Sequence, residues 1–150
     1  MSILKVDTLQ PATASAIHNA GTIVQTVRSE YRTYVTITST SFVATGVTGT
    51  ITPKFSNSKI LITPIINGLF NTSNVAHIQL RLYRASSSIA VLDTSVGYNS
   101  AGDEINYGIH SNVYQHEDSP STTSATTYTI YWKVSTGTAG INNYNALNGD

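Results

Sequence analysis

Histidine and carboxylate side chains could bind a metal ion or move a proton, and several of them gather between residues 110 and 118. His116, Glu117 and Asp118 are consecutive, and His110 lies six residues earlier. In one extended strand His110 and His116 would face the same side but lie about 20 Å apart, too far to share an ion. The three consecutive residues could bind a cation weakly. We favour a polar loop that leads into Ser119-Pro120, and predict no metal and no cofactor.

Catalysis needs groups that converge on one point, and the sequence offers few of them. Asp103 and Glu104 are adjacent in a predicted loop, whereas glycoside hydrolysis uses two carboxylates that usually come from separate elements. His77 shares a polar strand face with Gln79 and Arg81, as surface histidines commonly do. The sequence has no phosphate-binding glycine loop, no nucleophile elbow and no zinc-ligand spacing. We therefore predict no catalytic residue and no enzyme, with a depolymerase as the remaining enzymatic alternative.

Tyrosine is the abundant aromatic residue, with nine in the chain. Exposed tyrosines stack on sugar rings or anchor protein interfaces, and they also pack beneath neighbouring loops. Several lie in two predicted loops, 97–108 and 142–148. The candidate residues of these exposed binding loops are Tyr98, Asn99, Asp103, Tyr107 and Tyr144.

Strands must position all of these groups, because alternation of apolar and polar residues dominates the chain. In 76–85, Ile78, Leu80 and Leu82 point one way, and 126–135 repeats the pattern from Tyr128 to Val134. Turn residues follow at short, regular spacing, and no amphipathic helix of useful length is present. These features predict an all-β antiparallel β-sandwich, jelly-roll-like, with about eight strands. The other predicted strands are 22–29, 34–38, 42–52, 59–66, 89–95, 109–116 and a short one near Ile141.

Two of the predicted strands carry residues that disturb a sheet. Gly46 and Gly49 indicate a bend or bulge within 42–52. The segment 59–66 (KILITPII) is almost continuously apolar, which is typical of a buried strand. Pro64 lacks a backbone donor, and therefore predicts that the second half of this segment lies at an edge or a bulge.

The first 21 residues differ from the rest, because they contain no long alternating run. We predict a division into an N-terminal anchoring arm, 1–21, and a β-sandwich domain, 22–150. The apolar residues that would dock the arm on another chain are Ile3, Leu4, Val6, Leu9 and Ile17. A frayed terminus is the alternative interpretation.

The composition indicates a neutral, charge-poor surface. Charged residues make up 11% of the chain, the net charge is +0, and Thr, Ser and Asn supply roughly a third of the residues. Such a surface does not attract nucleic acid, and it does little to prevent self-association. The chain has no cysteine, no signal-peptide pattern and no apolar run long enough for membrane insertion.

Five segments of the chain form recognisable motifs: 4–10 (LKVDTLQ), 21–25 (GTIVQ), 45–54 (TGVTGTITPK), 56–62 (SNSKILI) and 118–132 (DSPSTTSATTYTIYW). These segments resemble a domain that recurs in tail-fibre and virion structural proteins of phages, especially marine and cyanobacterial phages. Together they span most of 21–142, and their motifs contain no catalytic residue.

This resemblance implies a homotrimer that is assembled in the host cytoplasm and lies on the virion surface. Proteins with the domain are often longer, and about twenty residues extend at most to roughly 70 Å. A short arm suits a capsid decoration (cement) protein or a short tail fibre, bound to a capsid, tail or baseplate protein of the same virion. The alternative is a tail-fibre tip that recognises host surface glycans through the two candidate loops.

Overall fold

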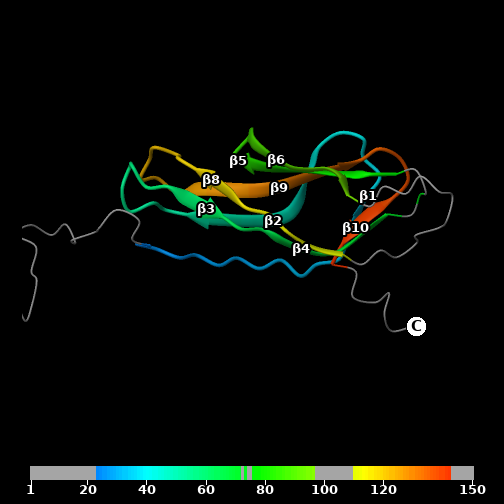
Figure 1. Cartoon of the computed structure of the whole chain (residues 1–150), viewed down its shortest axis with the longest axis horizontal. Coiled ribbons are helices and arrows are strands. Elements are labelled where there is room, and N and C mark those ends of the chain that lie inside the picture. The colour runs from blue at the N-terminus through cyan, green and yellow to red at the C-terminus, as the bar shows by residue number, and fades with distance from the viewer. Residues whose placement is uncertain (1–22, 72, 74–75, 97–109, 143–150) are drawn as a thin grey trace, which may run out of the picture.

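The structure, a computed structural model, describes residues 23–71, 73, 76–96 and 110–142 (Figure 1). These residues form ten strands in antiparallel sheets and no helix, which confirms the predicted all-β class. The strands are β1 (Val35–Ile37), β2 (Val43–Ile51), β3 (Ile60–Ile62), β4 (Ile65–Asn71), β5 (Ile78–Arg84), β6 (Ser87–Val96), β7 (His110–Val113), β8 (His116–Asp118), β9 (Thr126–Val134) and β10 (Ala139–Ile141).

The strands form two four-stranded sheets and one strand pair. The first sheet has the order β1-β10-β4-β7, the second has the order β2-β9-β5-β6, and β3 pairs with β8. The pair continues the first sheet, because Ile62 lies opposite His116 and Ile65 lies opposite Val113, with two residues between on each strand. Tyr114 N–H donates to the carbonyl of Pro64 at 3.0 Å within this gap. Pro64 therefore interrupts a ladder that resumes in the same register.

When the two interrupted strands are joined, the described residues form the eight strands of a jelly roll. The strands pair as nested hairpins: β5 with β6, β4 with β7, β2 with β9 and β1 with β10. The innermost turn follows Arg84, where Ala85 has a φ of 51°. A double sheet built from nested antiparallel pairs is the jelly-roll arrangement, so the finer prediction is also confirmed.

The core lies between the inner faces of the two sheets. The alternating residues of β5 and β9 supply most of it, and Trp132, Val134 and Leu80 are completely buried. Ile66 and Ile141 approach from the first sheet, with 2% and 1% of their surface exposed. The alternation read in 76–85 and 126–135 therefore identified the buried face correctly.

The predictions for 59–66 were partly wrong. The segment is buried on one face only, because Leu61 and Ile65 keep 64% and 57% of their surface exposed while Ile66 packs inward. The part after Pro64 is also not at an edge, since β4 lies between β10 and β7. A bulge does occur in β4, but it follows Ile66, where Gly68 has a φ of 59°.

The predicted bulge at Gly46 is confirmed. The ring of Tyr31, which lies against Gly46, explains why a glycine is needed there. The register of β2 against β9 shifts between Ala44 and Thr48, and Gly46 has a φ of 91°. A Cβ atom at this position would lie 2.5 Å from the Tyr31 ring. Glycine is therefore required both by the backbone conformation and by the close approach of the ring.

Residues 23–34 run beside the sandwich as an extended segment without a strand (Figure 1), so the predicted strand at 22–29 was wrong over its described part. Ile23 and Val27 are 83% and 47% exposed, while Val24 and Gln25 are half-buried. The segment borders a groove of about 820 Å³ between β2 of one sheet and β3 of the other. The segment therefore lies along the seam between the two layers, and it forms no ladder with either described sheet.

Candidate interaction surface

Three large apolar side chains share the outer face of the first sheet. Leu61 on β3, Ile65 on β4 and Val113 on β7 are 64%, 57% and 60% exposed. Ile65 and Val113 are direct cross-strand partners, and Leu61 lies four residues before Ile65 on the same face. We call these three residues the apolar strip.

The strip exists because the strand alternation continues through Pro64. Ile60, Ile62 and Ile66 point toward the core, so the residues between them point outward. A single exposed apolar residue is common on a protein surface, but a contiguous group on one flat face is characteristic of an interaction site.

An exposed ion pair lies at one end of the strip. Leu61 pairs across the ladder with Glu117, whose carboxylate is 2.7 Å from Lys59 Nζ. The hydrogen bond and the charge of Glu117 raise the pKa of Lys59. Because both side chains are more than half exposed, the pair neutralises charge beside the strip and adds little stability.

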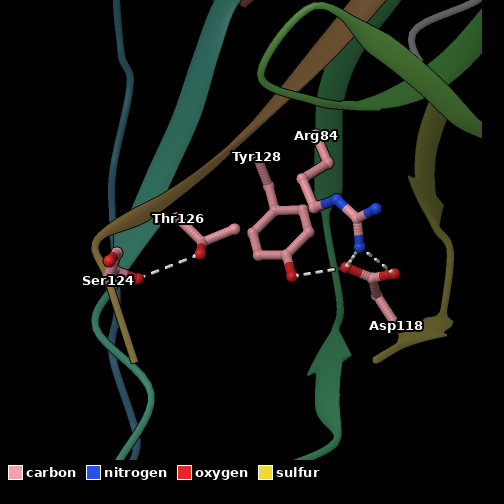
Figure 2. A network of polar contacts seen from close by, with 5 residues as sticks. All are labelled: Arg84, Asp118, Ser124, Thr126 and Tyr128. Carbon is pink, nitrogen blue, oxygen red and sulfur yellow. Dashed lines mark hydrogen bonds and ion pairs between the residues drawn. The ribbon is translucent and has the colours of Figure 1, made fainter. Parts of the chain in front are cut away.

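A second carboxylate, Asp118, joins the two sheets (Figure 2). Arg84 Nη1 donates to both of its carboxylate oxygens at 2.9 Å, and the Tyr128 hydroxyl donates to Oδ2 at 2.7 Å. Asp118 is on β8 of the first layer, whereas its two partners are on β5 and β9 of the second. Its side chain is only 11% exposed. A carboxylate held in this way is suited to fixing the layers and not to moving protons.

The hydrogen bond from Tyr128 also affects how this tyrosine titrates. Burial, then the hydrogen bond to Asp118 and its negative charge, raise the pKa of Tyr128 well above its usual value, while Arg84 acts in the opposite direction. Beside this group, the Thr126 hydroxyl donates to the carbonyl of Ser124 at 3.1 Å and orders the entry to β9 (Figure 2).

Tyr114 forms another bond between the layers. Tyr114 directly follows β7, and its hydroxyl donates a hydrogen bond to the Asp93 carboxylate on β6 at 3.2 Å. Burial, followed by the charge and hydrogen bond of Asp93, raises the pKa of Tyr114 well above its usual value. The two hydrogen bonds from tyrosine hydroxyls hold the layer that carries the strip against the second sheet.

The cluster at residues 116–118 is a strand rather than the polar loop we expected. Because side chains alternate along β8, Glu117 points outward to Lys59 while Asp118 points to Arg84, so their carboxylates diverge. Among the described residues, no group of three histidine, cysteine or carboxylate side chains could hold a metal ion. His77 lies on the outer face of the second sheet, with its Nε2 atom 3.4 Å from the Gln79 amide.

The other predicted site residues lie outside the described residues. They comprise the anchoring residues Ile3, Leu4, Val6, Leu9 and Ile17, and the loop residues Tyr98, Asn99, Asp103, Tyr107 and Tyr144. The division at residue 21 stays a prediction for the same reason.

Sequence reasoning missed the apolar strip. Leu61 and Ile65 were part of an apolar run that we interpreted as buried on both faces, and Val113 stands among polar residues. The available signal was Glu117, a charged residue that directly follows the predicted strand 109–116. A charged residue on the outer face of a sheet indicates that this face contacts solvent. The neighbouring positions on the same face are then exposed as well.

The chain matches no protein-family model, and no curated protein is similar to it at a significant level. In the part of the chain that the structure describes, no helix has the length and apolar character needed to span a membrane.

Proposed function

We propose that this chain is a non-enzymatic accessory structural protein of a tailed-phage virion. In this proposal it forms a homotrimer on the virion surface, attached through residues 1–21 to a capsid, tail or baseplate protein. It acts as a capsid decoration (cement) protein or a short fibre. The apolar strip is the observation that carries the proposal, and the resemblance of 45–62 and 118–132 to phage structural proteins supports the setting.

The strip supplies a physical reason for association. Full burial of one Leu, Ile or Val side chain contributes about 1.5–3 kcal/mol, and the three residues are each more than half exposed. Several copies that meet on this face would bury several such side chains at once. The surrounding charge is already neutralised by Lys59 and Glu117, so like charges do not oppose the contact.

The rigid attachment of the strip also favours a structural role. Arg84, Tyr128 and Tyr114 bind the strip's strands to the opposite sheet, so little order has to be gained on assembly. A surface that is already fixed loses less entropy when copies associate.

The self-association is tested by light scattering coupled to size-exclusion chromatography of the full chain. The unmodified chain should elute with the mass of a trimer. The variant Leu61→Ser/Ile65→Thr/Val113→Thr should shift to the monomer mass, while Val91→Thr should remain trimeric. Val91 is a matched control, because it is 57% exposed but lies on β6 of the second sheet. A trimer that survives the triple substitution would show that the strip is not the interface.

The virion role needs a separate measurement. Deletion of residues 2–20 should abolish incorporation into particles without changing the number of subunits in the isolated oligomer. Copy number then separates the two forms of the proposal: hundreds of copies per particle indicate decoration, and a few dozen or fewer indicate a fibre. Equal incorporation of the deleted and intact chains would contradict anchoring by the arm.

A further inference from the structure

The outer face of the second sheet gathers positive charge around one aromatic ring. The guanidinium carbon of Arg81 lies 4.3 Å from the centroid of the Phe42 ring, and Lys133 Nζ lies 5.1 Å from the same centroid. The two cationic groups are therefore no farther apart than the sum of these distances. Both interactions are of the cation–π type.

Strand register explains this grouping. Arg81 on β5 lies opposite Tyr131 on β9, and Lys133 is two residues further along β9. Val43 lies opposite Trp132, so Phe42, immediately before β2, comes beside Lys133. Since Trp132 points into the core, its neighbours along the strand point outward.

Two tyrosines extend the same face. Tyr83 and Tyr131 stack with ring centroids 4.0 Å apart and an interplanar angle of 24°, and both are half-buried. Together with Phe42, Arg81 and Lys133 they form what we call the cation–aromatic face.

The charge on this face has no counter-charge among the described residues. Arg28, Arg32, Lys59 and Arg84 each form an ion pair with a carboxylate, but Arg81 and Lys133 do not. Asp93 on the adjacent strand β6 accepts a hydrogen bond from Tyr114 of the other sheet, so its carboxylate is directed away from this face. Two cations held near each other without an acid favour the approach of an anion.

We propose that the cation–aromatic face binds a carboxylated polysaccharide, a chain of uronic-acid sugars. The guanidinium fork of Arg81 matches a carboxylate, and Lys133 supplies a second charge for the next acidic group. The tyrosine and phenylalanine rings offer apolar surfaces for the faces of the sugar rings between the charges. This inference goes beyond the proposed function and does not depend on it, because the face lies on the opposite sheet from the apolar strip.

Titration calorimetry of the full chain with polygalacturonate tests the inference, with neutral dextran and polyphosphate as comparison polymers. Polygalacturonate should bind, dextran should not, and polyphosphate should bind more weakly because it has no sugar rings. Arg81→Gln and Lys133→Gln should each weaken binding of polygalacturonate about tenfold, since each removes a charged hydrogen-bond donor. Lys54→Gln removes one positive charge outside the cation–aromatic face and should leave the affinity unchanged.

Three results would overturn the inference. The first is absence of binding to polygalacturonate, and the second is an equal loss of affinity in Lys54→Gln and Lys133→Gln, which would indicate attraction to overall charge alone. The third is polyphosphate binding as tight as that of polygalacturonate, which would indicate a site for polyanions without selection for sugars. None of these results bears on the oligomer mass, so the two proposals can fail separately.

Discussion

Arg84 and Asp118 face each other across the sandwich, and both oxygens of the Asp118 carboxylate are 2.9 Å from the same guanidinium nitrogen. The pair joins β5 of one layer to β8 of the other, next to the strand that carries Leu61. It is partly shielded, with 36% and 11% of the two side chains exposed. We therefore expect it to contribute to stability far more than the exposed pair on the neighbouring residue, Glu117.

Asp118→Asn should lower the free energy of unfolding by about 2–3 kcal/mol, because it removes the charged acceptor of two donors and leaves Arg84 without its counter-charge. Urea unfolding followed by Trp132 fluorescence measures the change. Glu117→Gln is the matched control. It removes a carboxylate from the same strand, but one whose ion pair with Lys59 is exposed to solvent. Equal losses in the two variants would show that the shielded pair has no special role.

Tyr128→Phe should cost about 1.5–3 kcal/mol at neutral pH through loss of the hydrogen bond to Asp118. It should also change the pH profile. Folding raises the pKa of Tyr128 above the usual 10.0, because the folded state favours the protonated hydroxyl. The contribution of this hydroxyl to stability is therefore complete below pH 10, and it is lost as the pH rises further. The alkaline fall in stability should therefore be shallower in the variant. Tyr34→Phe, at a 52% exposed tyrosine, should keep the full alkaline slope.

Gly46→Ala should destabilise the chain by about 1–3 kcal/mol, since the residue has a φ of 91° and its new methyl group would meet Tyr31. The displaced ring should loosen residues 23–34, so trypsin should cleave faster after Arg28 and Arg32. Gly137→Ala provides the comparison, because Gly137 also has a positive φ, 71°, but lies in an exposed turn before β10. If trypsin cleaved both variants faster, the cause would be a general loss of stability and not the displaced Tyr31 ring.

The proposed trimer should respond to salts as an apolar contact does. Sodium sulfate strengthens the burial of apolar surface, so it should lower the dissociation constant of the oligomer. Sodium chloride at equal ionic strength should have little effect, because Lys59 and Glu117 pair within one subunit. Analytical ultracentrifugation measures both constants, and dissociation by sodium chloride would point to an ionic interface instead.

The parts of the fold that follow local alternation were predictable from the sequence. Every second residue is apolar from Ile78 to Leu82 in β5 and from Tyr128 to Val134 in β9, so Leu80 and Trp132 could be assigned to the core without knowledge of their partners. The extended segment at 23–34 was not predictable in this way, because its apolar residues resemble those of a strand. The segment is not a strand because no neighbouring strand pairs with it, and only the tertiary structure shows this.

The candidate surfaces depend on pairings that are distant in sequence. The apolar strip needs Val113 to meet Ile65, and the Asp118 contact needs β8 to lie near β5. The cation–aromatic face needs the Phe42 ring to lie close to both Arg81 and Lys133. Each of these residues is ordinary in its own segment, so one sequence gives no signal for the grouping. Glycine at 46 was recognised as a bend, but its contact with Tyr31 was not.

The nesting of the hairpins determines when the protein can fold. Val35 is aligned with Ile141, and the central strand β9 follows the other three strands of the second sheet in the sequence. A nascent chain that ends before residue 126 has translated both edge strands of the second sheet without the strand that links β2 to β5. Such a chain exposes unpaired edges and apolar faces to its neighbours. The second sheet can therefore close only after β9 has been translated.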